Sequence, residues 1–364
     1  MNVSFVVHRI YPPYVGGDEV QIMKTAEELS RRGVDVAIFS ADYRPGLERQ
    51  TFYKDVEINR FPSFGRYYIS PRLLNCLCNK RNGIIHSSTY GHFPTLAATV
   101  CKAKNDQIKY VLQPHYHGAG RNLLNNLVMK IYNPLVGKRI FEKADKIRCL
   151  SEGEKALVVN DFGVSPSKIS VIPFGLDVDK LRIFKNRFRR EEKEHRILYV
   201  GQLENFKGVH LLIKAFAQLL KIFNEKATLR IIGNGSQKGS LTKLVMGLKI
   251  QDQVTFKANL TEEDLCREYC EASLFVLLSK LESYSIVVRE ALFFELPVIV
   301  LQNRVFEDLA KNRYCFEVSS QAGPKEIALK MLKCLKKDLQ PKIFRVPALN
   351  ETIETLITLY DKVG

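Results

Sequence analysis

Short apolar runs alternate with longer amphipathic stretches in the first half of the chain. The runs of strand length cover residues 3–7, 34–39, 83–86, 109–113, 146–150 and 169–172. Stretches with helical periodicity cover residues 18–32, 95–104 and 121–143, the last one broken near Pro134, and another helix starts at Ser151. Strands that alternate with helices in this way predict a parallel sheet with helices on both faces.

The same alternation restarts after residue 195. The expected strands cover residues 196–200, 228–232, 254–256, 274–278 and 298–301. The expected helices cover residues 209–223, 261–271, 286–296, 324–337 and 350–360, with one more ending at Leu248 and with Asn350 as a helix N-cap. We therefore predict two successive doubly wound α/β domains. Because open parallel sheets bind ligands at the carboxyl ends of their strands, we expect a ligand site in a cleft between the domains.

Between the two halves the composition changes. Residues 177–195 contain few apolar side chains and many basic ones, namely Lys180, Arg182, Lys185, Arg187, Arg189, Arg190 and Lys193. This composition predicts an exposed linker or surface excursion.

Overall composition limits the class of protein. The chain has 364 residues, 46% of them apolar and 26% charged, which is typical of a soluble globular protein with room for two domains. It begins with a strand rather than a basic-then-apolar leader, and no apolar run approaches the ~20 residues needed to span a bilayer. The eight cysteines lack paired zinc-type spacing. We expect free thiols and a cytoplasmic location.

A formal net charge of +16 predicts attraction to polyanions. Nucleic acid, an anionic membrane surface and phosphorylated small molecules all fit this charge. Charge alone does not choose between them.

The segment from Ser279 to Glu290 is the strongest candidate for a binding site. A buried strand precedes it and a helix follows, so Glu282 lies in the strand-to-helix turn and Glu290 lies about two turns into the helix. Ser283 and Ser285 are residue types that commonly cap helices. Free amides at a helix start bind an anion, and a carboxylate accepts hydrogen bonds from a vicinal diol. The alternative is a helix with an acidic first turn and a solvated glutamate.

Three further loops contain glycines next to expected strand ends. The first loop contains Gly16 and Gly17, where the backbone could approach a ligand closely. The next follows residue 200 and carries Gly201 and Lys207, whose ammonium group could neutralise a leaving diphosphate. Tight turns and a solvated lysine are the structural alternatives.

The third loop, Gly233-Asn234-Gly235, resembles a dinucleotide fingerprint. Its third glycine, Gly239, comes one residue late, and no clear acidic partner follows about 20 residues on. The loop therefore only weakly indicates binding of a nicotinamide cofactor, and it is adequate for binding another nucleotide.

His115 and His117 follow an expected strand of the first half. No third ligand stands at a recognisable metal spacing. One of them could orient or protonate a reacting group, and a structural role for either is the alternative. The sequences Asp161-Phe162-Gly163 and Asp177-Val178-Asp179 imitate kinase and metal motifs, but their surroundings indicate structural roles.

Taken in order, these motifs resemble glycosyltransferase family 4, the retaining enzymes of GT-B fold also described as group 1. The resemblance runs over nearly the whole chain. The matching segments are Pro12-Pro13-x-x-Gly16-Gly17, residues 29–36, 144–152 and 171–177, Tyr199-Val-Gly201 with Lys207-Gly208, Gly233-x-Gly235, and Glu282 with Glu290-Ala291-Leu292 and residues 296–299.

The resemblance implies two Rossmann-like domains facing across a cleft, with a final helix that crosses back to the first domain. The expected domains are residues 1–177 with 345–364 on the acceptor side, and residues 178–344, which hold a nucleotide-diphosphate sugar. His115, Glu282 and Lys207 are the implied catalytic residues. The implied donor-binding residues are Gly16, Gly17, Gly201, Gln202, Lys207, Gly233, Gly235, Glu282, Ser283, Tyr284, Ser285, Ile286 and Glu290.

Within that set the resemblance gives roles to individual groups. Glu290 accepts from the ribose hydroxyls, Glu282 contacts the donor sugar, and Lys207 binds the diphosphate. No metal and no cofactor is expected besides the donor substrate. Three positions depart from the family pattern: Gln202 stands where an arginine is common, Phe174 replaces an asparagine, and Ser283 and Ser285 replace glycines.

We therefore predict a retaining hexosyltransferase that moves a sugar from a nucleotide-diphosphate sugar to an acceptor hydroxyl on a glycan, a lipid-linked molecule or a small molecule. The basic, apolar-interleaved residues 122–143 could contact an anionic membrane surface that carries a lipid-linked acceptor. A packed helix with one solvated basic face is the alternative. A basic nucleic-acid-binding protein and a nicotinamide-dependent oxidoreductase stay open as other functions, although no nucleic acid partner is expected.

Overall fold

A computed structural model gives the structure of the chain and describes residues 1–120, 123–188 and 194–363. The chain divides into two compact units. Unit 1 comprises Met1–Gly175 and the carboxyl-terminal residues from Pro347, and unit 2 comprises Leu176–Val346. The first boundary lies two residues before the expected position and the second lies two residues after it.

Unit 1 is built on a sheet with the strand order β3-β4-β2-β1-β5-β6-β7-β8. Its strands are β1 (Asn2–Val7), β2 (Asp35–Tyr43), β3 (Gln50–Tyr53), β4 (Val56–Pro62), β5 (Gly83–Ser88), β6 (Ile108–Gln113), β7 (Lys146–Cys149) and β8 (Ile169–Val171). Val3 of the central strand pairs with Val36 on one side and with Ile84 on the other, in parallel. The expectation of a parallel sheet is wrong at one edge, because β3 runs antiparallel to β4.

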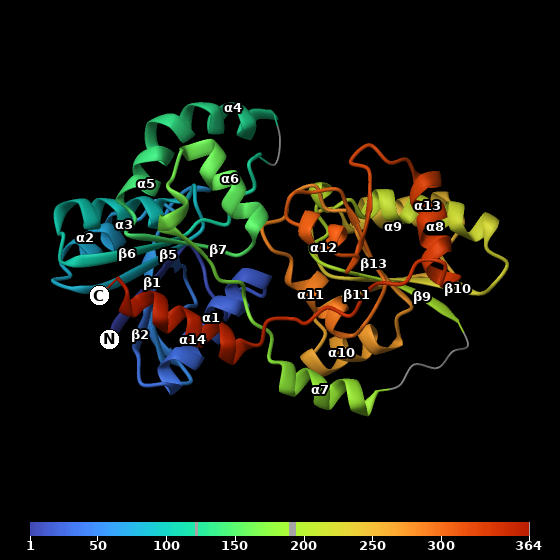
Figure 1. Cartoon of the computed structure of the whole chain (residues 1–364), viewed down its shortest axis with the longest axis horizontal. Coiled ribbons are helices and arrows are strands. Elements are labelled where there is room, and N and C mark those ends of the chain that lie inside the picture. Colours follow the sequence, from blue (N-terminus) through green and yellow to red (C-terminus); the bar gives the residue numbers. More distant parts are fainter. Residues whose placement is uncertain (121–122, 189–193, 364) are drawn as a thin grey trace. The chain divides into compact units, whose positions relative to one another are not determined.

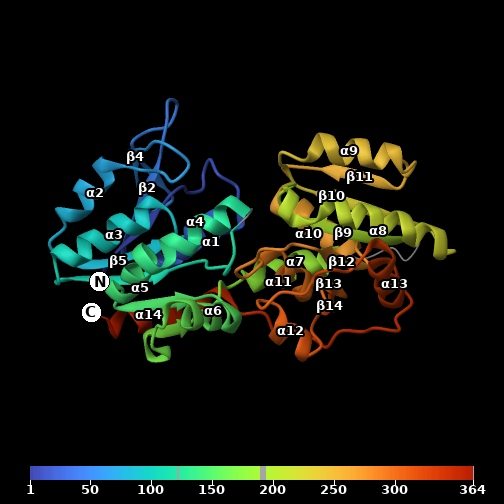
Figure 2. The same ribbon diagram turned by 90° about the horizontal axis from the view of Figure 1, so that it is seen from above.

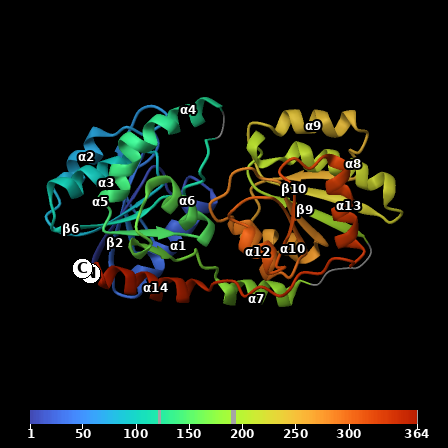
Figure 3. The same ribbon diagram turned by 45° about the horizontal axis from the view of Figure 1, so that its top comes forward.

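Helices cover both faces of this sheet (Figure 1 and Figure 3). The helices are α1 (Gly17–Arg31), α2 (Pro71–Cys78), α3 (Phe93–Lys104), α4 (Leu123–Tyr132), α5 (Lys138–Lys143), α6 (Glu152–Phe162) and α14 (Leu349–Asp361). Figures 1 and 3 show α2, α3 and α5 on one face and α1 with α14 on the other. The final helix α14 packs on α1 within unit 1. This confirms the expected return of the carboxyl-terminal helix to the first domain.

The region 50–78 contains elements that the sequence analysis missed. Strand β4 alternates between buried and half-buried residues, with Val56 and Ile58 fully buried, as a strand with one face on the core does. Helix α2 begins at Pro71, and its N-cap Ser70 accepts a hydrogen bond from the backbone nitrogen of Leu73. Both elements were readable from local pattern and cap chemistry.

The expected break near Pro134 is confirmed. Helix α4 passes into a single π-helical turn, Asn133–Gly137, before α5 starts. Because proline lacks a backbone N–H, one helical hydrogen bond is missing there and the hydrogen-bond register of the helix shifts. Arg121 and Asn122, the start of the predicted helix, lie outside the described residues.

Unit 2 has the strand order β11-β10-β9-β12-β13-β14, which is the order 3-2-1-4-5-6 along the sheet. The strands are β9 (His195–Val200), β10 (Ala227–Ile232), β11 (Val254–Lys257), β12 (Leu274–Leu277), β13 (Val298–Leu301) and β14 (Phe316–Val318). All neighbouring strands pair in parallel. The four residues of β12 are all buried, as expected for a central strand covered on both faces.

The helices of unit 2 again form two layers. They are α7 (Val178–Arg187), α8 (Val209–Ile222), α9 (Lys238–Gly247), α10 (Glu262–Glu271), α11 (Ile286–Phe293), α12 (Glu307–Lys311) and α13 (Pro324–Leu335). Helix α13 lies against α8, and α8 lies against α9, as Figure 2 shows from above. Helices α7 and α10 pack together. In Figures 1 and 3 they lie on the opposite face of the sheet from α8 and α9.

Over residues 177–195 the prediction of an exposed linker or surface excursion is right about the surface but misses a helix, because Val178–Arg187 is helical while Lys180, Arg182 and Arg187 are exposed. Asp177 caps α7 by accepting from the backbone nitrogen of Lys180. The basic side chains form ion pairs with acidic groups of unit 2: Arg187 with Glu263 at 2.8 Å, Lys185 with Glu295 at 2.7 Å, and Lys180 with Glu262. Leu181 is buried, Val178 and Phe184 pack against the core of unit 2, and the acidic first turn of α10 faces α7. Arg189, Arg190 and Lys193 lie outside the described residues.

Three smaller predictions have clear outcomes. The N-cap of α14 is Ala348 rather than Asn350, which lies inside the first turn. All eight cysteines are in the described part of the chain and carry free thiols. Over the described residues, no helix is both long and apolar enough to cross a membrane.

Candidate functional site

The β12–α11 turn, residues 278–285, lies where the strand order of unit 2 reverses. β12 is paired with β9, and the chain leaves these two strands in opposite directions along the sheet. The loop after β9 is fastened to this turn, because the backbone nitrogen of Lys280 donates to the carbonyl of Phe206 at 2.9 Å. At Gly208 (φ 72°) an added Cβ would lie 2.2 Å from the carbonyl oxygen of Leu278. Such reversal points are where open α/β sheets bind ligands.

Lys207 and Glu282 form an ion pair between these two loops. Nζ of Lys207 lies 2.7 Å from Oε1 of Glu282, and the two side chains are 17% and 9% exposed. The sequence analysis placed both residues at a donor site but did not expect them to bind each other. Each neutralises the other's charge.

Helix α11 begins without a side-chain cap. Ser285 occupies the N-cap position as expected, but it has a left-handed backbone (φ 64°) and its hydroxyl makes no cap hydrogen bond. The prediction that Ser283 or Ser285 caps the helix with its side chain is therefore wrong. The left-handed backbone also explains why the family often has glycine nearby, because a side chain costs free energy in that conformation. The first amides of α11 lack the serine oxygen that would normally satisfy one of them.

Glu290 lies on α11 one residue after a buried arginine. Oε2 of Glu290 accepts a hydrogen bond from the hydroxyl of Tyr269, on α10, at 2.8 Å. Burial raises the pKa of Tyr269 well above its ordinary value, and the charge of Glu290 raises it further. Tyr269 therefore stays a donor at all ordinary pH values and fixes the rotamer of the carboxylate.

The expected glycines of unit 2 are required by close packing of backbone. A Cβ at Gly233 would lie 1.9 Å from the carbonyl oxygen of Gly201, and one at Gly235 would lie 2.4 Å from the carbonyl oxygen of Leu203. These glycines let the loops after β9 and β10 lie directly on each other. Gln202 is exposed, and its carbonyl accepts from the hydroxyl of Tyr199 at 2.8 Å.

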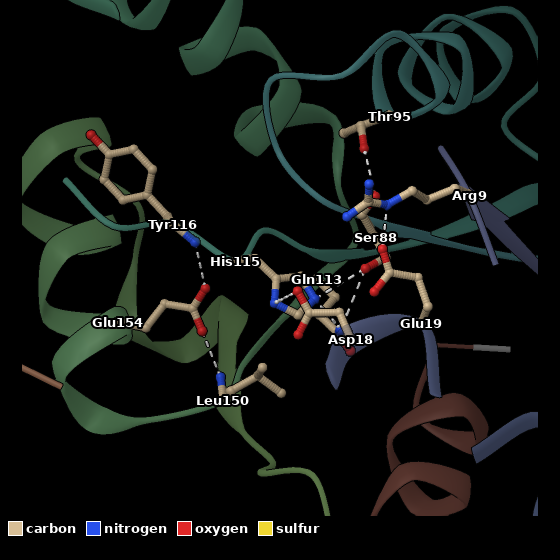
Figure 4. A network of polar contacts seen from close by, with 10 residues as sticks. All are labelled: Arg9, Asp18, Glu19, Ser88, Thr95, Gln113, His115, Tyr116, Leu150 and Glu154. Carbon is tan, nitrogen blue, oxygen red and sulfur yellow. Dashed lines mark hydrogen bonds and ion pairs between the residues drawn. The ribbon is translucent and has the colours of Figure 1, made fainter. Parts of the chain in front are cut away.

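In unit 1 the loop after β6 carries His115, which is buried and has a left-handed backbone (φ 51°). Figure 4 shows the ring between the side chains of Gln113, Ser88 and Asp18. We call these four residues the His115 cluster. The amide nitrogen of Gln113 lies 2.6 Å from Nε2 and the hydroxyl of Ser88 lies 3.1 Å from it.

These contacts determine the tautomer of His115. The Gln113 amide donates to Nε2, so the ring proton is on Nδ1, which faces Oδ2 of Asp18 at 3.5 Å. Burial lowers the pKa of His115, against the opposing charge of Asp18. The imidazole is therefore neutral near pH 7 and presents an N–H rather than a positive charge.

Glu154 supports the same loop, and the sequence analysis missed it. This carboxyl is fully buried, accepting from the backbone nitrogen of Tyr116 through Oε1 and from that of Leu150 through Oε2, each at 2.7 Å (Figure 4). Burial raises its pKa to about 8, against these two hydrogen bonds. The signal in the sequence was the Ser151-x-x-Glu154 spacing of a capping box. Ser151 does cap α6, but the glutamate also reaches across to the residue after His115.

The Gly16–Gly17 loop lies at the start of α1. A Cβ at Gly16 would meet the carboxylate of Glu19 at 2.0 Å, whereas one at Gly17 would meet nothing within 4 Å. Glu19 is buried and forms an ion pair with Arg9, at the end of β1. A Cβ at Gly16 would displace only the end of the Glu19 side chain, and Gly17 leaves an open stretch of backbone.

The other candidates have structural roles or no metal partners. His117 is exposed, and the described part of the chain contains no group of three histidine, cysteine or acidic side chains arranged for a metal ion. Asp161 accepts from the hydroxyl of Tyr116 at 2.7 Å. Phe174 is buried against the guanidinium of Arg148.

Comparison with known proteins was made with the sequence and with the fold. A family model described as Glycosyltransferase Family 4 matches residues 15–180, and one described as Glycosyl transferases group 1 matches residues 182–346. An uncharacterized glycosyltransferase of Methanocaldococcus jannaschii is 26% identical over 254 residues, which cover 64% of each chain. The chain therefore spans just under two thirds of that relative's length.

Two further comparisons cover more of the chain. Mannosylfructose-phosphate synthase of Agrobacterium fabrum is 22% identical over 89% of this chain and 79% of its own. The structure of sucrose-phosphate synthase from Thermosynechococcus elongatus superposes with a TM-score of 0.78 at 17% identity, over 100% of this chain and 98% of that one. At that identity the structural match establishes the fold.

The two family models follow one another along the chain and coincide with the two units. They favour neither a nucleic-acid-binding protein nor a nicotinamide-dependent oxidoreductase. The fold, the order of the two matches and the place of Glu282 and Glu290 at the reversal point of the second sheet agree. The chain therefore belongs to the GT-B glycosyltransferases, with a family 4 domain followed by a group 1 domain.

Proposed function

We propose that this glycosyltransferase is a retaining hexosyltransferase that uses a nucleotide-diphosphate sugar bound by unit 2. The observation that carries the proposal is the Lys207–Glu282 ion pair at the start of α11. It brings a cation, a carboxylate and uncapped helix amides to the reversal point of a 3-2-1-4-5-6 sheet. A ligand with a diphosphate and several hydroxyls needs these three kinds of group.

Each group has a distinct role in the proposal. The diphosphate takes the amides at Tyr284, Ser285 and Ile286 and the ammonium of Lys207. Glu282, released from Lys207 by the phosphate, accepts from hydroxyls of the donor sugar. Glu290 accepts from the ribose hydroxyls, and Tyr269 holds its carboxylate in place.

Retention follows in this proposal from attack on the same face that the diphosphate leaves. Lys207 and the amides stabilise the charge that grows on the departing phosphate. Neither glutamate serves as a nucleophile. His115, neutral with its proton on Nδ1, offers a hydrogen-bond donor rather than a positive charge. No metal ion is required, so the activity should persist in EDTA.

The experiment is a donor screen. UDP, GDP, ADP and dTDP are tested for thermal stabilisation of the protein, and the matching nucleotide sugars are tested for hydrolysis and transfer. We expect one nucleotide to raise the Tm, with the effect lost in Glu290→Ala and Lys207→Ala. The anomeric configuration of the product, read by NMR, tests retention. A protein that binds none of these nucleotides, or a product of inverted configuration, contradicts the proposal.

We also propose that unit 1 meets an anionic membrane surface that carries the acceptor. The exposed face of α4 and the π-turn carries Leu127, Ile131 and Leu135 at helical spacing, and they are 59%, 59% and 62% exposed. Lys130, Lys138 and Arg139 flank them and are exposed. Apolar side chains bordered by basic ones suit an interfacial helix.

Flotation with vesicles tests this surface. Wild type should bind vesicles that contain anionic lipid and not neutral ones. The Leu127→Ser/Ile131→Ser variant should lose binding at unchanged Tm, because both side chains are already in solvent. A protein that binds both kinds of vesicle equally, or neither, contradicts the membrane role and leaves the donor site unaffected.

A further inference from the structure

Arg289 is buried beside the β12–α11 turn, although it precedes Glu290 directly in the sequence. Successive residues on a helix point about 100° apart. Glu290 therefore reaches Tyr269 on α10, whereas Arg289 turns to the aromatic side chain of the turn itself. Its guanidinium carbon lies 4.4 Å from the ring centroid of Tyr284. Only 5% of Arg289 is exposed.

The charge of Arg289 has no carboxylate partner. Among the residues that the structure describes, its guanidinium forms no ion pair. The Tyr284 side chain hydrogen-bonds to it and the charge of Glu282 acts on it from further away, but Nη1 is shut off from solvent without a hydrogen-bond partner. One helical turn earlier, Oγ of Ser285 is also buried and unpartnered. Buried polar atoms are almost always paired, and an uncompensated buried cation is costly. Two such atoms in one turn mark a place where the protein offers groups that its own side chains do not use.

Arg148 of unit 1 shows that burial and stacking do not by themselves leave an arginine unpaired. It is fully buried, and its guanidinium lies 5.0 Å from the ring centroid of Phe174. Its Nε donates to the carbonyl of Ile172 at 3.0 Å and its Nη2 donates to that of Pro173 at 3.1 Å. Arg289 shares the burial and the aromatic contact but lacks the carbonyl partners.

Arg289 changes the sum of the formal charges around the β12–α11 turn. Lys207 and Glu282 cancel each other as an ion pair, and Glu290 contributes one negative charge. Without Arg289 these groups would sum to one negative charge, which would repel a diphosphate. With Arg289 they sum to zero before the helix amides are counted. Gln202, exposed on the neighbouring loop, contributes no charge.

We propose that Arg289 supplies positive potential to this turn from inside unit 2 and thereby strengthens binding of the donor's diphosphate. The proposal rests on the proposed function. Arg289 acts through its field and through the Tyr284 ring that it holds, so it is a positioning residue that does not touch the ligand. Burial lowers the pKa of Arg289, against the opposing effects of Tyr284 and Glu282. A bound anion relieves that penalty, and this relief appears as affinity.

The test separates diphosphate recognition from nucleoside recognition. Binding of UDP, GDP and ADP and of uridine, guanosine and adenosine is measured by calorimetry for wild type, Arg289→Met and Arg289→Lys. We expect Arg289→Met to lower the affinity for the best-binding nucleoside diphosphate by about tenfold. The affinity for the corresponding nucleoside should stay within about twofold of the wild-type value. Arg289→Lys, which keeps the charge, should recover most of the loss. The Tm of ligand-free Arg289→Met should equal or exceed that of wild type, because a buried unpaired charge is removed.

Two control arginines sharpen the result. Arg148→Met should lower the Tm without changing the ratio of diphosphate to nucleoside affinity. Arg267→Met removes an exposed arginine stacked at 4.7 Å on Phe188 and should change neither.

Three results would overturn the inference. If Arg289→Met weakens nucleoside and diphosphate equally, or weakens neither, the arginine does not act on the phosphates. If Arg289→Met fails to fold, Arg289→Lys replaces it in the test. An Arg289→Lys protein that folds but binds the diphosphate as poorly as it binds the nucleoside would also contradict an action on the phosphates. If wild type binds no nucleoside diphosphate at all, the proposed function fails first and the inference fails with it.

Discussion

The β12–α11 turn of unit 2 and the His115 cluster of unit 1 differ in how completely their polar groups are paired. Both lie at the carboxyl ends of parallel strands, and both contain a left-handed residue, Ser285 in one and His115 in the other. In the His115 cluster the ring nitrogens face protein groups, and the imidazole is neutral. In the turn the groups are charged, and two buried polar atoms lack partners.

The difference shows which site depends on a ligand for completion. A satisfied network around a neutral imidazole keeps its geometry without a substrate, because nothing in it gains from rearrangement. A turn with an unpaired buried cation and a bare helix start gains free energy when an anion arrives. We therefore expect substitutions in the turn to change binding and activity strongly, and those in the His115 cluster to change stability and its pH dependence.

The largest effect should come from separating Lys207 from Glu282. Lys207→Met should lower kcat/KM by about a thousandfold, because the diphosphate loses its ammonium. It should also lower the free energy of unfolding by about 3 kcal/mol, because Glu282 is left buried without its partner. Steady-state kinetics and urea unfolding measure the two losses.

A double substitution separates these two contributions. Lys207→Met/Glu282→Gln should recover most of the stability and none of the activity. If the double variant regains activity, the ion pair is structural and the contrast between the two sites fails.

Glu290→Gln should weaken nucleoside diphosphate binding by about thirtyfold, since hydrogen bonds to a charged carboxylate are worth about 2 kcal/mol. The loss should be equal for the nucleoside, because the ribose is common to both ligands. Tyr269→Phe, which removes one hydrogen bond to the carboxylate, should weaken binding a few-fold. Calorimetry with both ligands is the measurement, and a loss confined to the diphosphate would contradict the ribose role.

Glu154→Gln tests the support of the His115 loop. The pKa of Glu154 is raised to about 8 in the folded protein, so the folded state binds more protons than the unfolded state between about pH 4.5 and 8. Wild type therefore loses stability as the pH rises through this window, and the glutamine variant lacks that loss. The Tm of wild type minus that of the variant should fall between pH 5 and pH 8. A difference that rises with pH would mean that the ionised carboxylate is the favoured form.

The smallest effect should come from His115→Gln at acid pH. The lowered pKa of the buried imidazole means that the unfolded state takes up a proton first as the pH falls below about 6.5. Wild type should lose stability relative to the variant between pH 6.5 and pH 5, as measured by Tm. A relative gain for wild type in that range would indicate a protonated ring and would contradict the neutral tautomer.

The local sequence pattern was sufficient to predict most helices and strands. It was insufficient where charged groups or distant pairing partners determine whether an element forms. The apolar run before Ser279 and the helical period after Ile286 located the turn correctly, because strand and helix periods depend on near neighbours. Helix α7 was missed because its apolar content is low. Its Leu181 packs into the core of unit 2, and its ion pairs reach the acidic first turn of α10, which lies about 80 residues further along the chain. Strand β3 escaped notice because its antiparallel pairing depends on the neighbouring β4 rather than on its own period.

For the candidate site, residue types were predictable and their states were not. Glu282, Glu290 and Lys207 stand in recognisable segments, so each could be named from the sequence. Their exposure and protonation depend on what surrounds them, and that is set by packing. Arg289 and Glu154 could not be singled out from the sequence, because burial, which local pattern does not encode, gives each its unusual environment.

The sequence by itself determined most of the strands and helices, the two-domain α/β class and the residues of the β12–α11 turn. Only the tertiary structure decided that Lys207 and Glu282, 75 residues apart, neutralise each other and that Arg289 is buried with no carboxylate partner among the described residues. The physical reason is the distance along the chain over which each effect acts. Periodicity and cap chemistry act over a few residues, whereas the contact between the loops after β9 and β12 depends on strand order, which no local spacing encodes.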